Sequence, residues 1–283
     1  MSSLRPKALI ITAPGINCDL ELGHAFAMAG AEPTSELLAT LSRDPARVRG
    51  YDLIGLPGGF SFGDDIAAGR IMGAMIAKSL YGPLKDAVQR GVPMICPCNG
   101  FQIAVQSGLL PGPNGTDEAW PEQPASATVA LADNASGRFA DRWTRMEIPR
   151  ETICIWTRGL ACDAPDDLLP SAHGEGRFVA PTSVLDRLDA AGQVAMRYAD
   201  SENFNGSARA IAGICDASGL VFGLMPHPER YTRWTQHPRW TRLAPDSMRH
   251  EPLGLRVFRN AVRWVREDRR GASFEVTATL APT

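Results

Sequence analysis

Apolar runs bounded by turn-forming residues recur along the chain and predict buried strands. These runs occupy residues 8–12, 53–56, 92–95 and 219–225. Apolar positions spaced three and four apart predict helices at 20–29, 67–88 and 255–265, with a break in the second helix at Gly82-Pro83. Strands that alternate with helices favour a mostly parallel sheet flanked by helices on both faces. The pattern therefore predicts an α/β fold.

The stretches without a regular spacing of apolar residues are expected to lie outside the sheet and its helices. Residues 110–124 are rich in Pro, Gly and acidic side chains and are expected to form a surface loop, and residues 128–179 give only short strand-like signals. Residues 231–252 are expected to form an extended surface loop. With no composition shift along the chain, we expect one domain over residues 1–270 and a C-terminal tail over 271–283.

Composition excludes several classes of protein. Of 283 residues, 44% are hydrophobic and 21% are charged, which is enough to form a sizeable core. The net charge of -2 gives no basic excess for nucleic acid or a membrane surface, and no apolar stretch approaches the roughly 18 residues that span a bilayer. The N-terminus lacks a signal-peptide pattern, so we expect a cytoplasmic protein with reduced cysteines. No cysteine pair has the usual spacing of a metal site, and no metal is expected.

Cys98 is the first candidate for chemistry. It follows the apolar run 92–95, and Asn99-Gly100 permits a sharp turn before a helical pattern begins at Phe101. Such a strand–turn–helix elbow presents a nucleophile to a pocket, and the helix N-terminus favours the reactive thiolate. The alternative is an inert buried cysteine, because free cysteines are often buried.

His227 and Glu229 follow the last predicted strand and are separated by Pro228, which prevents a helix through the pair. A cysteine nucleophile needs a base, and the base needs an acceptor that orients it. Cys98, His227 and Glu229 supply these three parts at two strand ends. Taken singly, His227 is also consistent with an ordinary histidine in a proline-rich turn. Glu229, taken singly, is also consistent with a surface carboxylate.

Gly58-Gly59 is a third element at a strand end. Two glycines let the backbone approach a ligand and direct an N–H at it, as an oxyanion hole requires. A phosphate cradle is the rival use, but no glycine-rich nucleotide motif is present. A simple tight turn is the third possibility.

The residues Cys98-Asn99-Gly100-Phe101-Gln102 and His227-Pro228-Glu229 resemble the site of class I glutamine amidotransferases, which have a flavodoxin-like fold. More narrowly, the chain resembles the glutaminase subunits of phosphoribosylformylglycinamidine synthase, an enzyme of purine biosynthesis. The stretches that carry the narrower resemblance are 14–19, 57–64, 172–177, 205–207 and 223–230.

The resemblance implies a role for each matching residue. Cys98 would attack the side-chain amide of glutamine, His227 would carry the proton and Glu229 would orient His227. The backbone N–H groups of Gly59, next to Gly58, and Asn99 would hold the oxyanion. Gln102 would contact the bound glutamine.

The resemblance also implies partners. Ammonia would pass to a large synthetase subunit that makes formylglycinamidine ribonucleotide, and a small bridging subunit would join the assembly. ATP and magnesium would belong to the synthetase, which agrees with the missing phosphate motif in this chain. No nucleic acid or membrane partner is implied.

Some positions depart from the family pattern or remain open. Cys96 stands where the family usually has glycine, and Pro97 stands where it has a β-branched or small residue. Cys96 could form a strained oxidised pair with Cys98 or compete with it for alkylating agents. His173 and Glu175 lie in a family-like loop near the site, which either contacts the glutamine, contacts the synthetase or is structural. Cys18 is interpreted as structural. A different cysteine hydrolase, such as a peptidase, and an inactive scaffold subunit remain the alternative functions.

Overall fold

The predicted alternation of strands and helices is present in the computed structural model, which describes residues 5–162 and 167–279. The predicted apolar runs correspond to β1 (Lys7–Thr12), β3 (Leu53–Gly55), β4 (Met94–Pro97) and β11 (Val221–Leu224). Their residues are almost all buried, which explains why each strand is a continuous apolar run and not an alternating one.

A nine-stranded mixed sheet has the order β2-β1-β3-β4-β11-β10-β9-β6-β7. Neighbouring strands are parallel from β2 to β11 and antiparallel from β11 to β7. The antiparallel pair of β5 and β8 forms a second, two-stranded sheet. The remaining strands are β2 (Glu32–Leu37), β5 (Ala130–Asp133), β6 (Ala140–Glu147), β7 (Leu168–His173), β8 (Glu175–Val179), β9 (Val194–Tyr198) and β10 (Ile211–Cys215).

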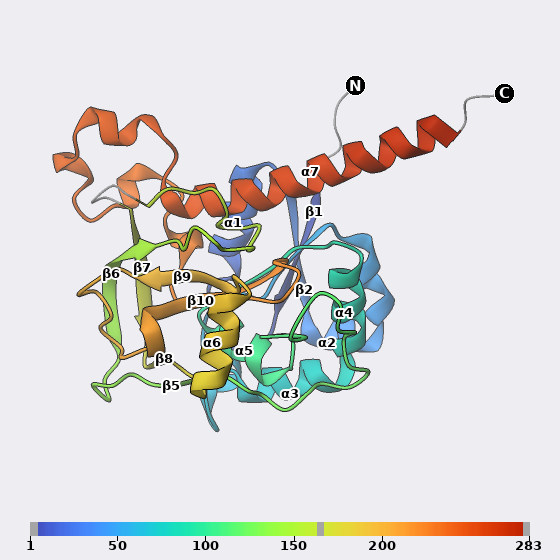
Figure 1. Ribbon diagram of the computed structural model, residues 1–283, viewed down its shortest axis with the longest axis horizontal. Helices are drawn as coiled ribbons and strands as arrows, with labels where there is room; N and C mark the ends of the chain where they lie inside the picture. Colours follow the sequence, from blue (N-terminus) through green and yellow to red (C-terminus); the bar gives the residue numbers. More distant parts are fainter. Residues whose placement is uncertain (1–4, 163–166, 280–283) are drawn as a thin grey trace.

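Helices cover both faces of the parallel strands. Figure 1 shows α7 and α1 on one side of the sheet and α3 and α5 on the other. The helices are α1 (Asp19–Ala29), α2 (Leu38–Arg43), α3 (Arg70–Ser79), α4 (Tyr81–Gln89), α5 (Asn99–Gln106), α6 (Thr182–Ala190) and α7 (Leu253–Thr279). The apolar stripe predicted near the C-terminus is the buried face of α7, whose Phe258 packs edge-to-face on Phe26 of α1 and Trp156.

Two features of the chain differ from the sequence-based expectation. The helical break falls at Leu80 and not at Gly82-Pro83, because a proline in the first turn removes an N–H that has no helical partner. Helix α7 continues through Gly271 to Thr279, so the expected tail begins within a helix, and residues 280–283 lie outside the described part. The division at residue 270 stays a prediction.

Several elements were not predicted at all: α2, α6, β2, β9 and β10. The sequence of β2 is mostly polar because it is an edge strand with exposed side chains, so it lacks an apolar run. The expected loop over 231–252 contains three short 3₁₀ turns. In the described part of the chain, no helix is both long and apolar enough to span a membrane.

Candidate active site

The carboxyl ends of three parallel neighbours, β3, β4 and β11, bring the predicted residues together. Leu224 of β11 lies opposite Pro97 of β4, so the segments that follow these two strands leave the sheet side by side. Cys98 follows β4, His227 follows β11, and the glycine pair follows β3. Loops at this edge of a parallel sheet form the binding sites of such folds.

Cys98 occupies a strained turn between β4 and α5. Its φ of 51° and ψ of -110° are unusual for a residue other than glycine, and its N–H donates to Leu224 O at 2.7 Å. The turn is tight: a Cβ added to Gly100 would lie 1.9 Å from Leu56 O. The predicted elbow is therefore present, with the first N–H groups of α5 directly after the thiol.

His227 and Glu229 form a buried pair. His227 Nδ1 and Glu229 Oε1 are 2.6 Å apart, and both side chains are almost completely buried. Burial opposes the charged imidazole, but the Glu229 carboxylate and the nearby thiols outweigh it and raise the pKa of His227 well above its usual value. His227 Nε2 has no hydrogen-bond partner among the described residues, so it is available to a reacting group.

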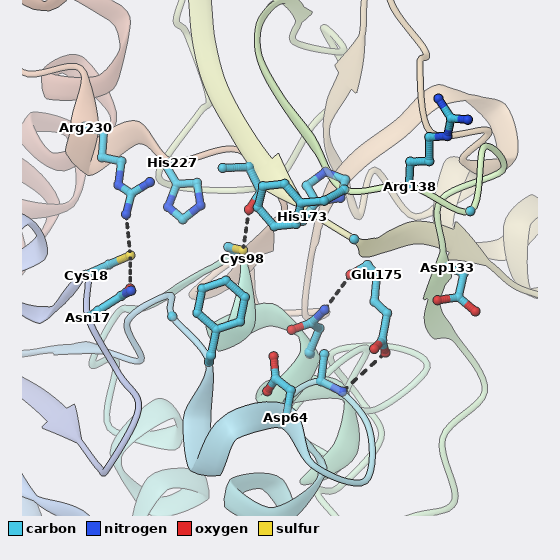
Figure 2. A pocket seen from close by; sticks show the side chains of 18 residues that line it. Asn17, Cys18, Asp64, Cys98, Asp133, Arg138, His173, Glu175, His227 and Arg230 are labelled. Carbon is cyan, nitrogen blue, oxygen red and sulfur yellow. Dashed lines mark hydrogen bonds between the residues drawn. The ribbon is translucent and has the colours of Figure 1, made fainter.

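Gly58 lies between the thiol and the imidazole. A Cβ added to it would lie 2.9 Å from His227 Cε1 and 3.4 Å from Cys98 Cβ, so only a glycine leaves the two side chains room to face each other. Cys98, His227 and Gly59 line a cavity of about 360 Å³. Figure 2 shows Cys98 and His227 together at this cavity, with the Cys98 thiol 3.7 Å from Ala172 O.

Asn99 and Gln102 connect α5 to the surrounding loops. The Asn99 side chain accepts the Ser61 N–H at 3.2 Å and donates to Gln102 Oε1 at 2.9 Å. Gln102 Nε2 donates to Glu175 O, and Gln102 lines the cavity. Both ends of the Gln102 amide therefore bind the protein itself, and its contact with glutamine stays a prediction.

His173 and Glu175 line the same cavity (Figure 2). Glu175 Oε2 accepts the Ala68 N–H at 3.3 Å, and His173 is 3% exposed. Asn134 holds His173 through a contact of 3.0 Å between Asn134 Oδ1 and His173 Nδ1. The motif 172–177 therefore lies at the site, and the sequence analysis missed Asn134, which stands in a stretch without a recognised motif.

Cys18 and Arg230 also line the cavity. The sequence analysis interpreted Cys18 as structural, yet its Sγ accepts a hydrogen bond from Arg230 Nη2 at 3.0 Å. Cys18, His227 and Glu229 place possible metal-ligand atoms within 4.8 Å of one another. His227 and Glu229 already contact each other, and the Arg230 guanidinium already contacts the Cys18 sulfur. The positive charge of this guanidinium disfavours a metal cation beside the same sulfur. A site without metal stays our prediction.

Cys96 does not share the cavity with Cys98. It is completely buried in β4, and burial raises the pKa of its thiol far above the usual value. A buried thiol of this kind is a poor nucleophile. We therefore expect no competition from Cys96 for alkylating agents, contrary to the possibility raised by its spacing.

Comparisons with known proteins agree with this geometry. A family model described as a CobB/CobQ-like glutamine amidotransferase domain matches residues 5–265. Phosphoribosylformylglycinamidine synthase subunit PurQ of Dehalococcoides mccartyi is 36% identical over 271 residues, which cover 92% of this chain and 98% of that protein. The subunit PurQ of Mycobacterium tuberculosis H37Rv is 40% identical over 226 residues, covering 78% and 85%.

Solved structures extend the comparison to the fold. A chain of the structure of PurLQS from Thermotoga maritima is similar with a TM-score of 0.68 and 31% identity, covering 93% of this chain and all of that one. The glutaminase domain of Trypanosoma brucei CTPS, at 14% identity and a TM-score of 0.53, shares the fold alone. The chain therefore belongs to the CobB/CobQ-like glutamine amidotransferases and, among them, to the PurQ subunits of phosphoribosylformylglycinamidine synthase.

Proposed function

We propose that this chain hydrolyses glutamine to glutamate and ammonia through a thioester on Cys98. The observation that carries the proposal is the arrangement of Cys98 at a strained elbow and the buried pair of His227 and Glu229 at one cavity. Nucleophile, base and orienting acceptor are the three parts of covalent catalysis by a thiol.

The reaction proceeds in two steps. His227, with its raised pKa, holds the proton given up by the Cys98 thiol while the sulfur attacks the carboxamide carbon of glutamine, and this proton goes to the departing nitrogen, which leaves as ammonia. Water then attacks the thioester, His227 takes a proton from it, and that proton returns to the departing Cys98 sulfur as glutamate forms. Glu229 keeps the imidazole oriented through Nδ1 in both steps.

Backbone N–H groups stabilise the negative oxygen that develops in each step. Asn99 is the first residue of α5, where an N–H has no partner within the helix. Gly59 has a φ of 138° and lines the cavity, and a Cβ there would lie 2.7 Å from Asn17 N. The proposed oxyanion hole consists of these two N–H groups.

The ammonia is supplied to a separate synthetase subunit that converts formylglycinamide ribonucleotide to formylglycinamidine ribonucleotide. The names of the relatives support this assignment, and the similar Thermotoga maritima chain comes from a structure described as PurLQS. We propose that ATP and magnesium bind the synthetase and not this chain. A small bridging subunit completes the assembly.

Release of ammonia and glutamate from glutamine tests the proposal. The chain is assayed alone and with the synthetase, formylglycinamide ribonucleotide and ATP-magnesium. We expect release that depends on the partner, because closure on a partner can complete a site and limit the waste of ammonia. Cys98→Ser should abolish it while ammonia-dependent synthesis continues, and Cys96→Ser is the matched control. Glutamine-dependent synthesis that survives Cys98→Ser would refute the proposal.

A further inference from the structure

The ring of His173, at the end of β7, is held on several sides. Asn134 Oδ1 contacts Nδ1 at 3.0 Å, and the ring of Phe204 lies against the imidazole with a centroid distance of 5.4 Å. A Cβ added to Gly176 would lie 2.2 Å from Nδ1, so the ring also packs on the backbone of this glycine. The orientation of His173 is therefore fixed by the fold.

The hydrogen bonds of Asn134 determine which nitrogen of His173 carries the proton. Asn134 Nδ2 donates to Arg138 O at 3.0 Å and to His173 O at 2.8 Å, which uses both amide hydrogens. Asn134 Oδ1 must then face His173 Nδ1 as an acceptor, so Nδ1 is the protonated nitrogen. His173 Nε2 is left with a free lone pair.

This nitrogen is a buried acceptor without a partner. Burial, and secondly the charge of His227, lower the pKa of His173 to about 4, so the ring is neutral near pH 7. His173 is 3% exposed, and Nε2 has no hydrogen-bond partner among the described residues. An unsatisfied buried acceptor is unfavourable, because it has lost its hydrogen bond to water and gained none in the protein. A ligand that donates a hydrogen bond at this point would remove that cost.

The surroundings of His173 indicate the charge of that ligand. Ala172, the preceding residue, contacts the Cys98 thiol through its carbonyl, so His173 stands next to the nucleophile. Three carboxylates line the same cavity: Asp64, Asp133 and Glu175 (Figure 2). Arg138 and Arg230 line the cavity as well, and Arg230 donates to the Cys18 sulfur. In a cavity with these three carboxylates, a neutral acceptor suits a cationic N–H donor, and the cationic group of glutamine is its α-ammonium.

We propose that His173 Nε2 accepts a hydrogen bond from the α-ammonium group of the bound glutamine, which makes His173 a specificity residue for the substrate. This inference rests on the proposed function. Asn134 is the positioning residue that keeps Nε2 unprotonated and directed at the substrate.

Binding without turnover gives the first test. Full-length Cys98→Ala protein, in complex with its synthetase, is titrated by calorimetry with glutamine and with 4-carbamoylbutanoate, which lacks only the α-ammonium. Adding His173→Phe keeps a ring against Phe204 but removes the acceptor. We expect glutamine binding to weaken about tenfold, the value of one hydrogen bond to a charged group, and binding of 4-carbamoylbutanoate to stay unchanged.

Two further variants exclude a merely structural effect. His173→Gln retains an acceptor and should restore part of the affinity for glutamine. His237→Phe changes another buried histidine that does not line the cavity and should alter neither ligand. Equal weakening of both ligands by His173→Phe, or no weakening of either, would overturn the inference.

Steady-state kinetics separate this inference from the proposed function. In the complex with Cys98 intact, His173→Phe should raise KM for glutamine about tenfold and leave kcat within about threefold of the wild-type value. The reason is that the α-ammonium is bound equally in the ground state and in the transition state. A fall in kcat with KM unchanged would assign His173 to the reacting carboxamide and contradict the proposal. Absence of ammonia release that depends on Cys98 would instead refute the proposed function.

Discussion

The parallel and antiparallel halves of the nine-stranded sheet contribute to the cavity by different means. In the parallel half, the ends of β3, β4 and β11 position the glycine pair, Cys98 and His227, and the side chain that orients His227 is Glu229, only two residues further on. In the antiparallel half, β7 supplies His173, whose orientation depends on a side-chain contact with Asn134. In our proposals, the first half carries the groups that react, and the second carries a group that binds the substrate.

This difference implies different sensitivities to substitution. A change to a reacting group in the parallel half should lower kcat and leave the fold intact. A change to the hydrogen bonds around His173 should alter stability and substrate affinity, and affect the chemical step little. The experiments below test whether the two halves separate in this way.

The largest effect is expected for Glu229→Gln, which removes the carboxylate that holds His227 Nδ1. Loss of the orienting acceptor should lower kcat about 10²- to 10⁴-fold, as for general-base catalysis, with little change in KM. Glutamine-dependent kcat of the complex is the measurement, and Glu118→Gln in an exposed loop is the control. A loss below threefold would show that Glu229 does not orient the base.

Stability should depend on pH through His173. Its folded pKa is about 4 and its unfolded pKa about 6.5, so between these values the unfolded chain binds a proton that the folded chain does not. The free energy of unfolding should therefore fall as the pH drops from about 6.5 to about 4, by on the order of 3 kcal/mol from this group.

Urea unfolding of the wild type and His173→Gln at several pH values measures this contribution. Between about pH 6.5 and about pH 4, the free energy of unfolding should fall less in His173→Gln than in the wild type. His227 does not interfere, because its raised pKa gives stability that is fully present below pH 6.5 and is lost only at higher pH. Parallel curves for the two proteins would contradict the neutral, buried state of His173.

Asn134→Ala should destabilise the protein by about 1–3 kcal/mol, because His173 Nδ1 and two backbone carbonyls lose their partner in a buried place. It should also raise KM for glutamine. The urea midpoint at pH 7 is the measurement, and Asn114→Ala on an exposed loop should leave it unchanged. If Asn134→Ala lowered kcat as strongly as Glu229→Gln, the two halves would not be separable.

The smallest effect concerns the two neighbouring thiols. Iodoacetamide should modify Cys98 in the folded protein and leave Cys96 untouched, because Cys96 is completely buried with a raised pKa. Mass spectrometry of the peptide that contains both residues locates the label. In urea both should react, which serves as the control, and labelling of Cys96 in the folded protein would show that β4 opens.

The sequence predicted best the elements that local patterns define, namely the buried strands and the turns that follow them. Continuous apolar runs marked β1, β3, β4 and β11, since strands covered on both faces need no polar positions. The turn residues after these runs pointed to Cys98, the glycine pair and His227. The exposed edge strand β2 and the antiparallel pair of β5 and β8 gave no such signal, because half-exposed strands tolerate polar residues.

What the sequence determined by itself is the fold class, the strand ends that carry chemistry and the family. Only the tertiary structure brought Cys18 and Arg230 into contact, placed Asn134 against His173 and directed Cys96 away from the cavity. The physical reason is that strand ends follow from local patterns of burial and turn chemistry. Side-chain contacts between segments tens or hundreds of residues apart depend on how the whole sheet is assembled.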